Sequence, residues 1–126
     1  MNDKVKIAVD AMGGDNAPKK IIKGIELSLK QKKDNFFNLF GKKDLIENEV
    51  KNNNLVRENS EIIDAKDIIS DDESPLAAAK KSKETSMWKS IEFLKNKKAD
   101  ITLSAGNTGA MLVISRLLLN NIKGIN

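Results

Sequence analysis

Two glycine-bearing turns carry the residue types best suited to binding an anion. The first turn contributes Asp10, Gly13, Gly14 and Asp15, and the second contributes Ser104, Gly106, Asn107, Thr108 and Gly109. Each turn follows an expected strand and precedes an expected helix, where glycine lets the backbone approach a ligand and free N–H groups attract negative charge. Asn107 and Thr108 would add side-chain donors. The alternative is that both segments are tight turns without a ligand, since neither matches the dinucleotide-binding pattern or a Walker loop.

Three further groups of side chains each have a chemical and a structural interpretation. Asp10 and Asp15 could bind a metal or orient a ligand, but aspartate also commonly caps turns. Ser86 could donate a hydrogen bond to a ligand, or it caps or spaces a helix. A basic cluster between two expected helices would attract an anionic ligand, or it is a solvated face. The cluster consists of Lys80, Lys81 and Lys83.

The composition excludes several classes of site. The 126 residues include no cysteine and no histidine, so a zinc site built on these ligands and a Ser-His-Asp triad within this chain are excluded. We expect neither a resident metal nor a cofactor. The net charge is only +4, and only Arg57 and Arg116 are arginines. With aromatic residues at 4%, this composition disfavours nucleic-acid recognition. No apolar run approaches the roughly 20 residues of a membrane-spanning helix, so we expect a cytoplasmic protein.

The pattern of apolar residues predicts alternating strands and helices that would position these turns. Strands are expected at 5–10, 36–40, 61–65 and 101–104. One helix is expected to open at Asn16, as its N-cap, and others at 42–52, 76–81, 85–96 and 110–119. The alternation predicts a Rossmann-like α/β fold, a mainly parallel sheet with helices on both faces, and no internal boundary within 1–126.

The last predicted helix bears on the completeness of the fold. Residues 110–119 are apolar nearly all round, so we expect this helix to be deeply buried. Four strands leave at least one edge of a parallel sheet open, and no closing strand follows this helix. We therefore expect the chain to be truncated, the amino-terminal part of a single α/β domain.

Three sequence blocks together resemble a known enzyme family. The blocks are Ile7–Asp15 followed by Ala17-Pro18, Asp72–Pro75 with Lys80–Met87, and Ala99-Asp100 with Ser104–Ala110. In order and spacing they resemble the bacterial acyl-acyl-carrier-protein:phosphate acyltransferases of phospholipid synthesis, the PlsX family. The chain departs from the family pattern at Lys80, where arginine is usual, at Thr85, where serine is usual, and at Lys42, where an acid is usual. Family members are also more than twice as long.

The resemblance implies a reaction and a set of partners. Inorganic phosphate would attack the thioester of an acyl-acyl-carrier protein, giving acyl phosphate and the free carrier thiol. It also implies a phosphotransacetylase-like fold, a homodimer and peripheral association with the membrane, while the composition already argues against a nucleic-acid partner. The Gly106–Gly109 turn is expected to bind phosphate, and the Asp10–Asp15 turn would form a wall of the same cleft. The lysine cluster would hold phosphate or the acidic carrier protein, and no catalytic residue is assigned within this chain. The alternative function is a non-catalytic truncated α/β fragment that at most binds an anion.

Overall fold

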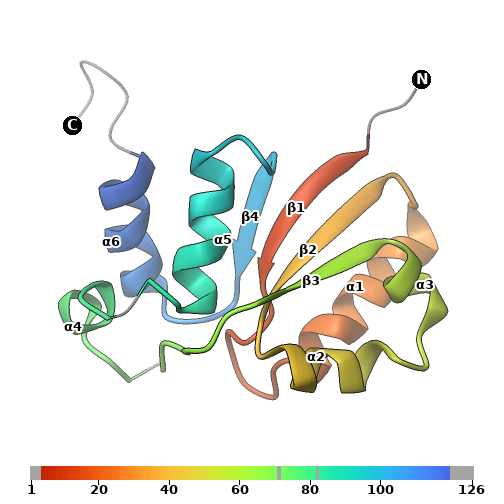
Figure 1. The fold of residues 1–126 in the computed structure, drawn as a ribbon, viewed down its shortest axis with the longest axis horizontal. Coiled ribbons are helices and arrows are strands. Elements are labelled where there is room, and N and C mark those ends of the chain that lie inside the picture. Colours follow the sequence, from red (N-terminus) through yellow and green to blue (C-terminus); the bar gives the residue numbers. More distant parts are fainter. Residues whose placement is uncertain (1–3, 71, 82, 120–126) are drawn as a thin grey trace.

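The computed structural model describes residues 4–70, 72–81 and 83–119, and a parallel sheet forms its centre (Figure 1). The four strands are β1 (Val5–Asp10), β2 (Asn35–Gly41), β3 (Ser60–Asp64) and β4 (Ile101–Ser104). Their order in the sheet is β3-β2-β1-β4. The chain therefore builds outward from β1 to β3 and then crosses back to add β4 on the other side of β1. This reversal brings the carboxyl ends of β1 and β4 together, which is where open α/β sheets bind ligands.

Helices cover both faces of the sheet, as predicted from the sequence. The helices are α1 (Lys19–Gln31), α2 (Lys43–Val50), α3 (Asn54–Glu58), α4 (Pro75–Ala79), α5 (Ser86–Lys95) and α6 (Thr108–Leu119). On one face, α1 to α3 pack over β1 to β3, while α5 packs against the opposite face of β1, β2 and β4. The helix α6 packs beside α5 and against α4 rather than directly on the sheet. The predicted α/β class and the parallel sheet are confirmed.

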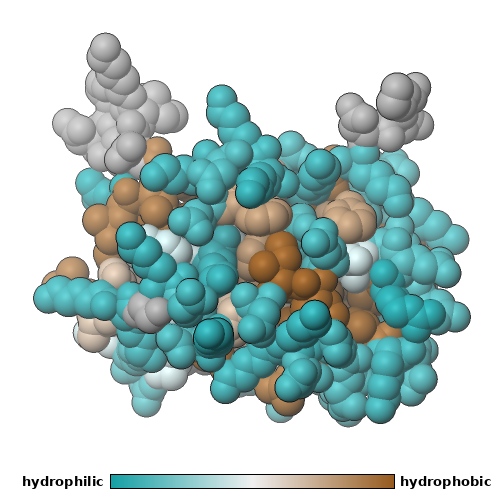
Figure 2. Space-filling view, viewed as in Figure 1, coloured by the Kyte–Doolittle hydropathy of each residue, from teal (hydrophilic) through white to brown (hydrophobic). Residues whose placement is uncertain are grey.

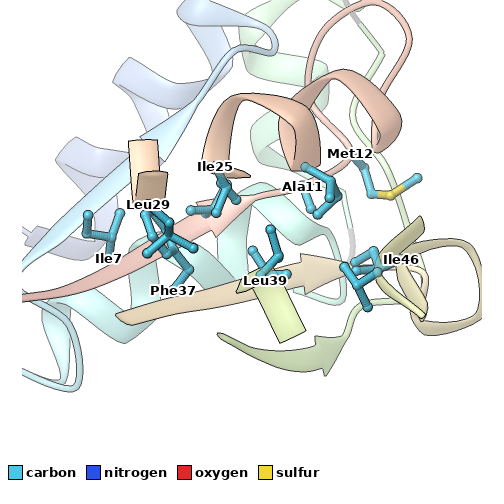
Figure 3. Close-up of a cluster of buried hydrophobic side chains, with 12 residues drawn as sticks. Ile7, Ala11, Met12, Ile25, Leu29, Phe37, Leu39 and Ile46 are labelled. Carbon is cyan, nitrogen blue, oxygen red and sulfur yellow. The ribbon is translucent and has the colours of Figure 1, made fainter. Parts of the chain in front are cut away.

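The main core lies between α1 and the central strands. Ile22, Ile25 and Leu29 recur at the spacing of one helix face, and all three are buried. They meet Ile7 of β1 and Phe37 of β2, whose side chains point to the same face of the sheet (Figure 3). Burying each of these side chains contributes roughly 1.5–3 kcal/mol, so this face fixes α1 against the sheet. Ala11 and Met12, which precede the glycines of the turn after β1, belong to the same buried cluster, so the core anchors this turn on the α1 face of the sheet.

The alternate residues of the same strands face α5. Ala8 of β1 and Phe40 of β2 are almost completely buried there. The ring of Phe40 meets that of Phe93 edge to face, with centroids 4.9 Å apart. The period of two along each strand thus anchors helices on both sides of the sheet.

The predicted N-cap at Asn16 is wrong. Helix α1 begins at Lys19, and the residue in the cap position is Pro18, which has no side chain able to accept a hydrogen bond. Asn16 instead has a φ of 62°, a left-handed conformation that asparagine tolerates, and its backbone carbonyl accepts the N–H of Lys20. It therefore starts the helix through its backbone rather than through its side chain.

The helix expected at 42–52 is present as α2, and a short helix that was not expected follows the asparagine run. Helix α2 ends at Val50; its Ile46 and Val50 are buried, whereas Leu45 is 48% exposed. The side chain of Asn53 accepts the N–H of Val56 at 3.1 Å and so caps the short helix α3. The five residues of α3 are too few to show a helical period, which is why the sequence pattern did not reveal them.

Deep burial of the last helix is also not observed. In α6 only Ala110, Ile114 and Leu118 are buried, against α4 and α5. Leu112 and Leu117 are 64% and 58% exposed. Figure 2 shows apolar side chains gathered on the outer side of the molecule at α6. The described residues pack against this helix from one side, so its other apolar side chains face outward.

Candidate functional site

The two glycine turns contact each other at the carboxyl ends of β1 and β4. A Cβ atom at Gly13 would lie 2.8 Å from the backbone nitrogen of Gly106, and one at Gly106 would lie 3.2 Å from the Cα of Gly13. Gly14 has a φ of 89°, and a Cβ there would lie 3.0 Å from the carbonyl oxygen of Ala105. Only glycine allows this conformation and these distances without displacement. The two turns, which the sequence predicts to lie at one edge of the sheet, are therefore in direct contact there.

Asp10 is the buried centre of this edge. Its carboxylate accepts hydrogen bonds from the Ser86 hydroxyl at 2.5 Å, the Ser104 hydroxyl at 2.9 Å and the Met12 N–H at 3.2 Å. Burial raises the pKa of the Asp10 carboxyl above its ordinary value of 3.8, while these hydrogen bonds act in the opposite direction. Asp10 thereby ties the end of β1 to α5 and β4. A buried carboxylate at this position orients the turns, and it would repel an anion brought close to it.

Ser104 links the carboxylate of Asp10 to the second glycine turn. Its hydroxyl donates to Asp10 and accepts the N–H of Gly106 at 3.1 Å. The N–H of Gly106 is thus engaged within the protein in this structure. Gly106 was predicted to contact phosphate. Because its N–H is already bonded, its role would instead be to shape the turn that brings the start of α6 to the edge of the sheet.

Asn107 also has partners within the protein. Its side-chain oxygen accepts the N–H of Ala110 at 3.0 Å, and its amide donates to the carbonyls of Ser70 and Glu73 at 3.2 and 2.8 Å. Asn107 therefore caps α6 and holds the loop before α4. A Cβ at Gly109 would lie 2.6 Å from the Cγ of Pro75, so this glycine permits close packing between α4 and α6.

The backbone at the start of α6 offers the donors that could meet an anion. Asn107 accepts the N–H of Ala110 through its side chain and that of Met111 through its carbonyl. Helix geometry leaves the N–H groups of Thr108 and Gly109 without acceptors inside the helix. The side chain of Thr108 is exposed beside them. With the helix dipole, these groups favour a bound anion by roughly 0.3–1 kcal/mol at an exposed end.

The remaining predicted residues lie in different surroundings. Ser86 is buried and donates to Asp10, whereas Asp15 is exposed in the first turn. The ammonium of Lys81 lies 2.6 Å from the Glu73 carboxylate and 3.1 Å from the carbonyl of Ile68. Its hydrogen bond lowers the pKa of Glu73 below the ordinary value.

The other two lysines of the cluster differ from Lys81. The ammonium of Lys83 lies 5.8 Å from the centre of the Trp88 ring, and Lys80 is exposed at the end of α4. Two of the three lysines therefore have partners within the protein, and Lys81 helps to hold the loop that Asn107 also contacts. The cluster is not simply a solvated face.

The structure adds Lys20, which the sequence pattern did not single out. This residue, in the first turn of α1, lines a groove together with Asp10, Ser104 and Ala105. Its position in the first turn of the helix that follows the first glycine turn was the available signal, but one lysine among many does not indicate a site. Lys20 thus lines the same groove as residues of both turns.

The described residues contain neither a cluster of metal-binding side chains nor a helix able to span a membrane. Among residues 4–70, 72–81 and 83–119, no three acidic, histidine or cysteine side chains gather as a set of metal ligands. No helix in the described part of the chain has both the length and the apolar character needed to cross a bilayer.

Comparison with known proteins gives a consistent set of relatives. A family model described as "Fatty acid synthesis protein" matches residues 5–126. The chain is 51% identical over 126 residues to the "Phosphate acyltransferase" of Pelagibacter ubique, covering all of this chain and 37% of that relative. It is 40% identical over 120 residues to the protein of the same name from Clostridium acetobutylicum, covering 95% of this chain and 36% of that relative. The corresponding protein of Clostridium tetani is 38% identical over 122 residues, covering 97% of this chain and 36% of that relative. The chain thus spans little more than a third of the length of these relatives.

Proposed function

Since the chain belongs to the fatty acid synthesis protein family, we propose that it is the amino-terminal part of a phosphate acyltransferase acting on acyl-acyl-carrier protein. The observation that carries the proposal is the contact between the two glycine turns at the start of α6. This contact brings the N–H groups of Thr108 and Gly109, which have no acceptor within α6, to the edge where open parallel sheets bind ligands. The single α/β domain predicted for residues 1–126 would then continue in the rest of the enzyme.

The proposed reaction needs neither a side-chain nucleophile nor a cofactor. An oxygen of inorganic phosphate forms a bond to the thioester carbonyl carbon, and the bond from that carbon to sulfur breaks. The products are acyl phosphate and the carrier thiolate, which takes up a proton to become the thiol. Such a reaction requires a positioned phosphate and donors for the developing oxyanion. The N–H groups of Thr108 and Gly109 and the ammonium of Lys20 are the groups of this chain that we assign to phosphate.

The partners follow from the same proposal. The exposed Lys80, with Lys81 and Lys83 beside it, would meet the acidic carrier protein, because opposite charges speed and orient association. The enzyme would be a homodimer in the cytoplasm that associates peripherally with the membrane into which its product passes. Phospholipid synthesis would consume the acyl phosphate.

A second function is kept because the chain covers only 37% of its relative and β4 has one unpaired edge among the described strands. In this alternative the chain binds an anion and catalyses nothing. A thiol-release assay with acyl-acyl-carrier protein and phosphate separates the two. We expect this chain alone to release no thiol, since residues beyond it would complete the cleft. Phosphate-dependent release at the rate of a full-length relative would show that the catalytic site lies within these 126 residues.

Substitution at Thr108 tests the phosphate site directly. Proline is well tolerated at the first position of a helix, so Thr108→Pro removes one N–H donor while preserving α6. Thr108→Ala keeps that donor and removes only the hydroxyl. Losing a hydrogen bond to a charged group costs about 1.5–3 kcal/mol, so Thr108→Pro should weaken phosphate binding about tenfold or more.

The measurement is a phosphate titration followed by the amide NMR signals of α6. Thr108→Ala should bind within a few-fold of the parent chain. Equal phosphate affinity in the proline and alanine variants would refute the assignment. So would phosphate-induced shifts that occur only at the lysine cluster.

A further inference from the structure

The hydroxyl of Ser104 lies between the buried carboxylate of Asp10 and the second glycine turn. It donates to Asp10 Oδ2 at 2.9 Å and accepts the N–H of Gly106, two residues before Thr108, at 3.1 Å. A hydroxyl has one hydrogen to donate and two positions at which it accepts. While Asp10 is ionised, the single hydrogen of Ser104 is therefore used within the protein, and this side chain has no hydrogen left to donate to a ligand.

The two carboxyl oxygens of Asp10 differ in what a proton on them would displace. Oδ1 accepts the Ser86 hydroxyl at 2.5 Å and the N–H of Met12 at 3.2 Å. An N–H cannot turn round to accept, and Ser86 is 1% exposed, so a hydrogen turned away from Asp10 there would not reach water. Oδ2 accepts the hydroxyl of Ser104, which is half-buried and lines the groove at this edge of the sheet. A proton on Asp10 is therefore best placed on Oδ2.

The surroundings of Asp10 favour its protonated form. Burial raises the pKa of this carboxyl, while its hydrogen bonds act in the opposite direction. The groups that α5 and β4 turn toward it are the neutral hydroxyls of two serines, and its paired residue in β2 is a phenylalanine. The charged groups at this edge come from the first turn, at Asp15, and from α1, at Lys20, and both residues are exposed.

We propose that Ser104 is a further donor to the anion at the start of α6, and that it donates when Asp10 carries a proton. The proton on Oδ2 is then donated to the oxygen of Ser104, which still accepts the N–H of Gly106 and turns its own hydrogen toward the groove. The same proton removes the negative charge that repels an anion. This inference rests on the proposed function and adds that the anion takes up one proton when it binds.

The test measures sulfate binding to this chain at several pH values through the amide NMR signals of Gly106, Thr108 and Gly109. Sulfate is the probe because it keeps its charge near neutral pH, where phosphate changes its own. The affinity should fall by up to tenfold per pH unit as Asp10 loses its proton, since binding and protonation are linked. An affinity that does not change with pH would overturn the proposal. An affinity that rises with pH would also overturn it.

Substitution of Asp10 removes the proton dependence directly. The side-chain amide of Asp10→Asn donates to Ser104 as the protonated carboxyl does, and it does not titrate. This variant should bind sulfate equally well at all pH values, and at least tenfold more tightly than the parent chain where Asp10 is ionised. Asp44→Asn removes an exposed carboxylate from the first turn of α2 and should keep the pH dependence of the parent chain. A parent-like pH dependence in Asp10→Asn would contradict the proposal.

Substitution of Ser104 separates its hydroxyl from the charge of Asp10. If loss of charge were the whole effect, Asp10→Asn would strengthen sulfate binding equally in the presence and in the absence of Ser104→Ala. If the hydroxyl donates, the gain from Asp10→Asn should be at least threefold smaller when it is combined with Ser104→Ala. Equal gains would show that Ser104 is not a donor to the anion.

A measurement on the parent chain covers the case in which Asp10→Asn does not fold. Because linkage is reciprocal, sulfate should raise the pKa of Asp10 further, which the NMR signal of its carboxyl carbon reports. The same pKa with and without saturating sulfate would overturn the proposal. Sulfate binding at α6 without proton uptake would refute this inference alone. Absence of binding at α6 at every pH would refute the proposed anion site and this inference with it.

Discussion

The two glycine turns lie against each other, but they use their polar groups differently. In the turn after β1, the carboxylate of Asp10 is buried and bonded to Ser86 and Ser104. In the turn after β4, a helix of 12 residues begins, and the N–H groups of Thr108 and Gly109 have no acceptor within it. The first turn therefore holds the edge of the sheet in shape, while the second presents donors. A glycine-rich sequence alone does not distinguish these two roles.

The largest effect is expected where the turns touch. Gly13→Ala places a Cβ 2.8 Å from the Gly106 nitrogen and 2.9 Å from the Asp10 carboxylate. Overpacking of this kind should lower the free energy of unfolding by about 2–3 kcal/mol and weaken phosphate binding. Gly24→Ala is the matched control, since its Cβ meets nothing, and it should raise the free energy of unfolding by up to about 1 kcal/mol. Urea denaturation measures both, and equal stability of the two variants would mean that the turns are not in close contact.

A smaller effect is expected from the two serines that donate to Asp10. Ser86→Ala and Ser104→Ala each remove a hydrogen bond to a buried carboxylate, at a cost of about 1–3 kcal/mol. Only Ser104 also accepts the N–H of Gly106. Both variants should therefore unfold at lower urea concentration, but Ser104→Ala alone should perturb phosphate binding. If Ser86→Ala impairs phosphate binding equally, Asp10 rather than the Ser104 link determines the shape of the second turn.

The smallest effect is a change in how stability depends on pH. The pKa of Asp10 is raised on folding, so the folded state holds its proton more tightly than the unfolded chain. The contribution of Asp10 to stability is therefore complete below its ordinary pKa of 3.8 and decreases as pH rises through the raised value. Asp10→Asn should remove this decrease. Unfolding free energies of both proteins across that pH range provide the measurement, and a parent-minus-variant difference that rises with pH would contradict the assignment.

Local patterns in the sequence predicted the elements well. The β-branched run at Val5–Asp10 and the short run at Ile101–Ser104 became strands with the predicted bounds. In each strand the large apolar residues alternate along the chain and so share one face, as in Val5, Ile7 and Val9 of β1 and Ile101 and Leu103 of β4. The sequence also predicted that both turns lie at one edge of the sheet, because parallel strands have their carboxyl ends at the same edge.

Partners distant in the chain could not be predicted in the same way. The bond from Ser86 to Asp10 joins residues 76 positions apart, and Asn107 reaches Ser70 across 37. The residue type at position 107 predicted a side-chain donor for a ligand. In the structure the amide of Asn107 donates to the backbone carbonyls of Ser70 and Glu73. The exposure of the apolar side chains of α6 could not be predicted from the sequence pattern either. Periodicity indicates which residues share a helix face, but burial depends on which other elements pack against that face.

The order of the strands also determines when the site can assemble. Strands β1 and β2 pair across a separation of 30 residues, from Val5 to Asn35, whereas Asp10 and Ser104 are 94 residues apart. Closing the longer loop costs about 1 kcal/mol more in chain entropy, and distant parallel pairing is slow. During synthesis from the amino terminus, β1 to β3 with α1 can form while β4 is still absent. Until β4 arrives, the side of β1 that will carry the site is an unpaired edge. The candidate site thus forms only after the first three strands have been made, and this delay leaves one edge of β1 open to wrong partners.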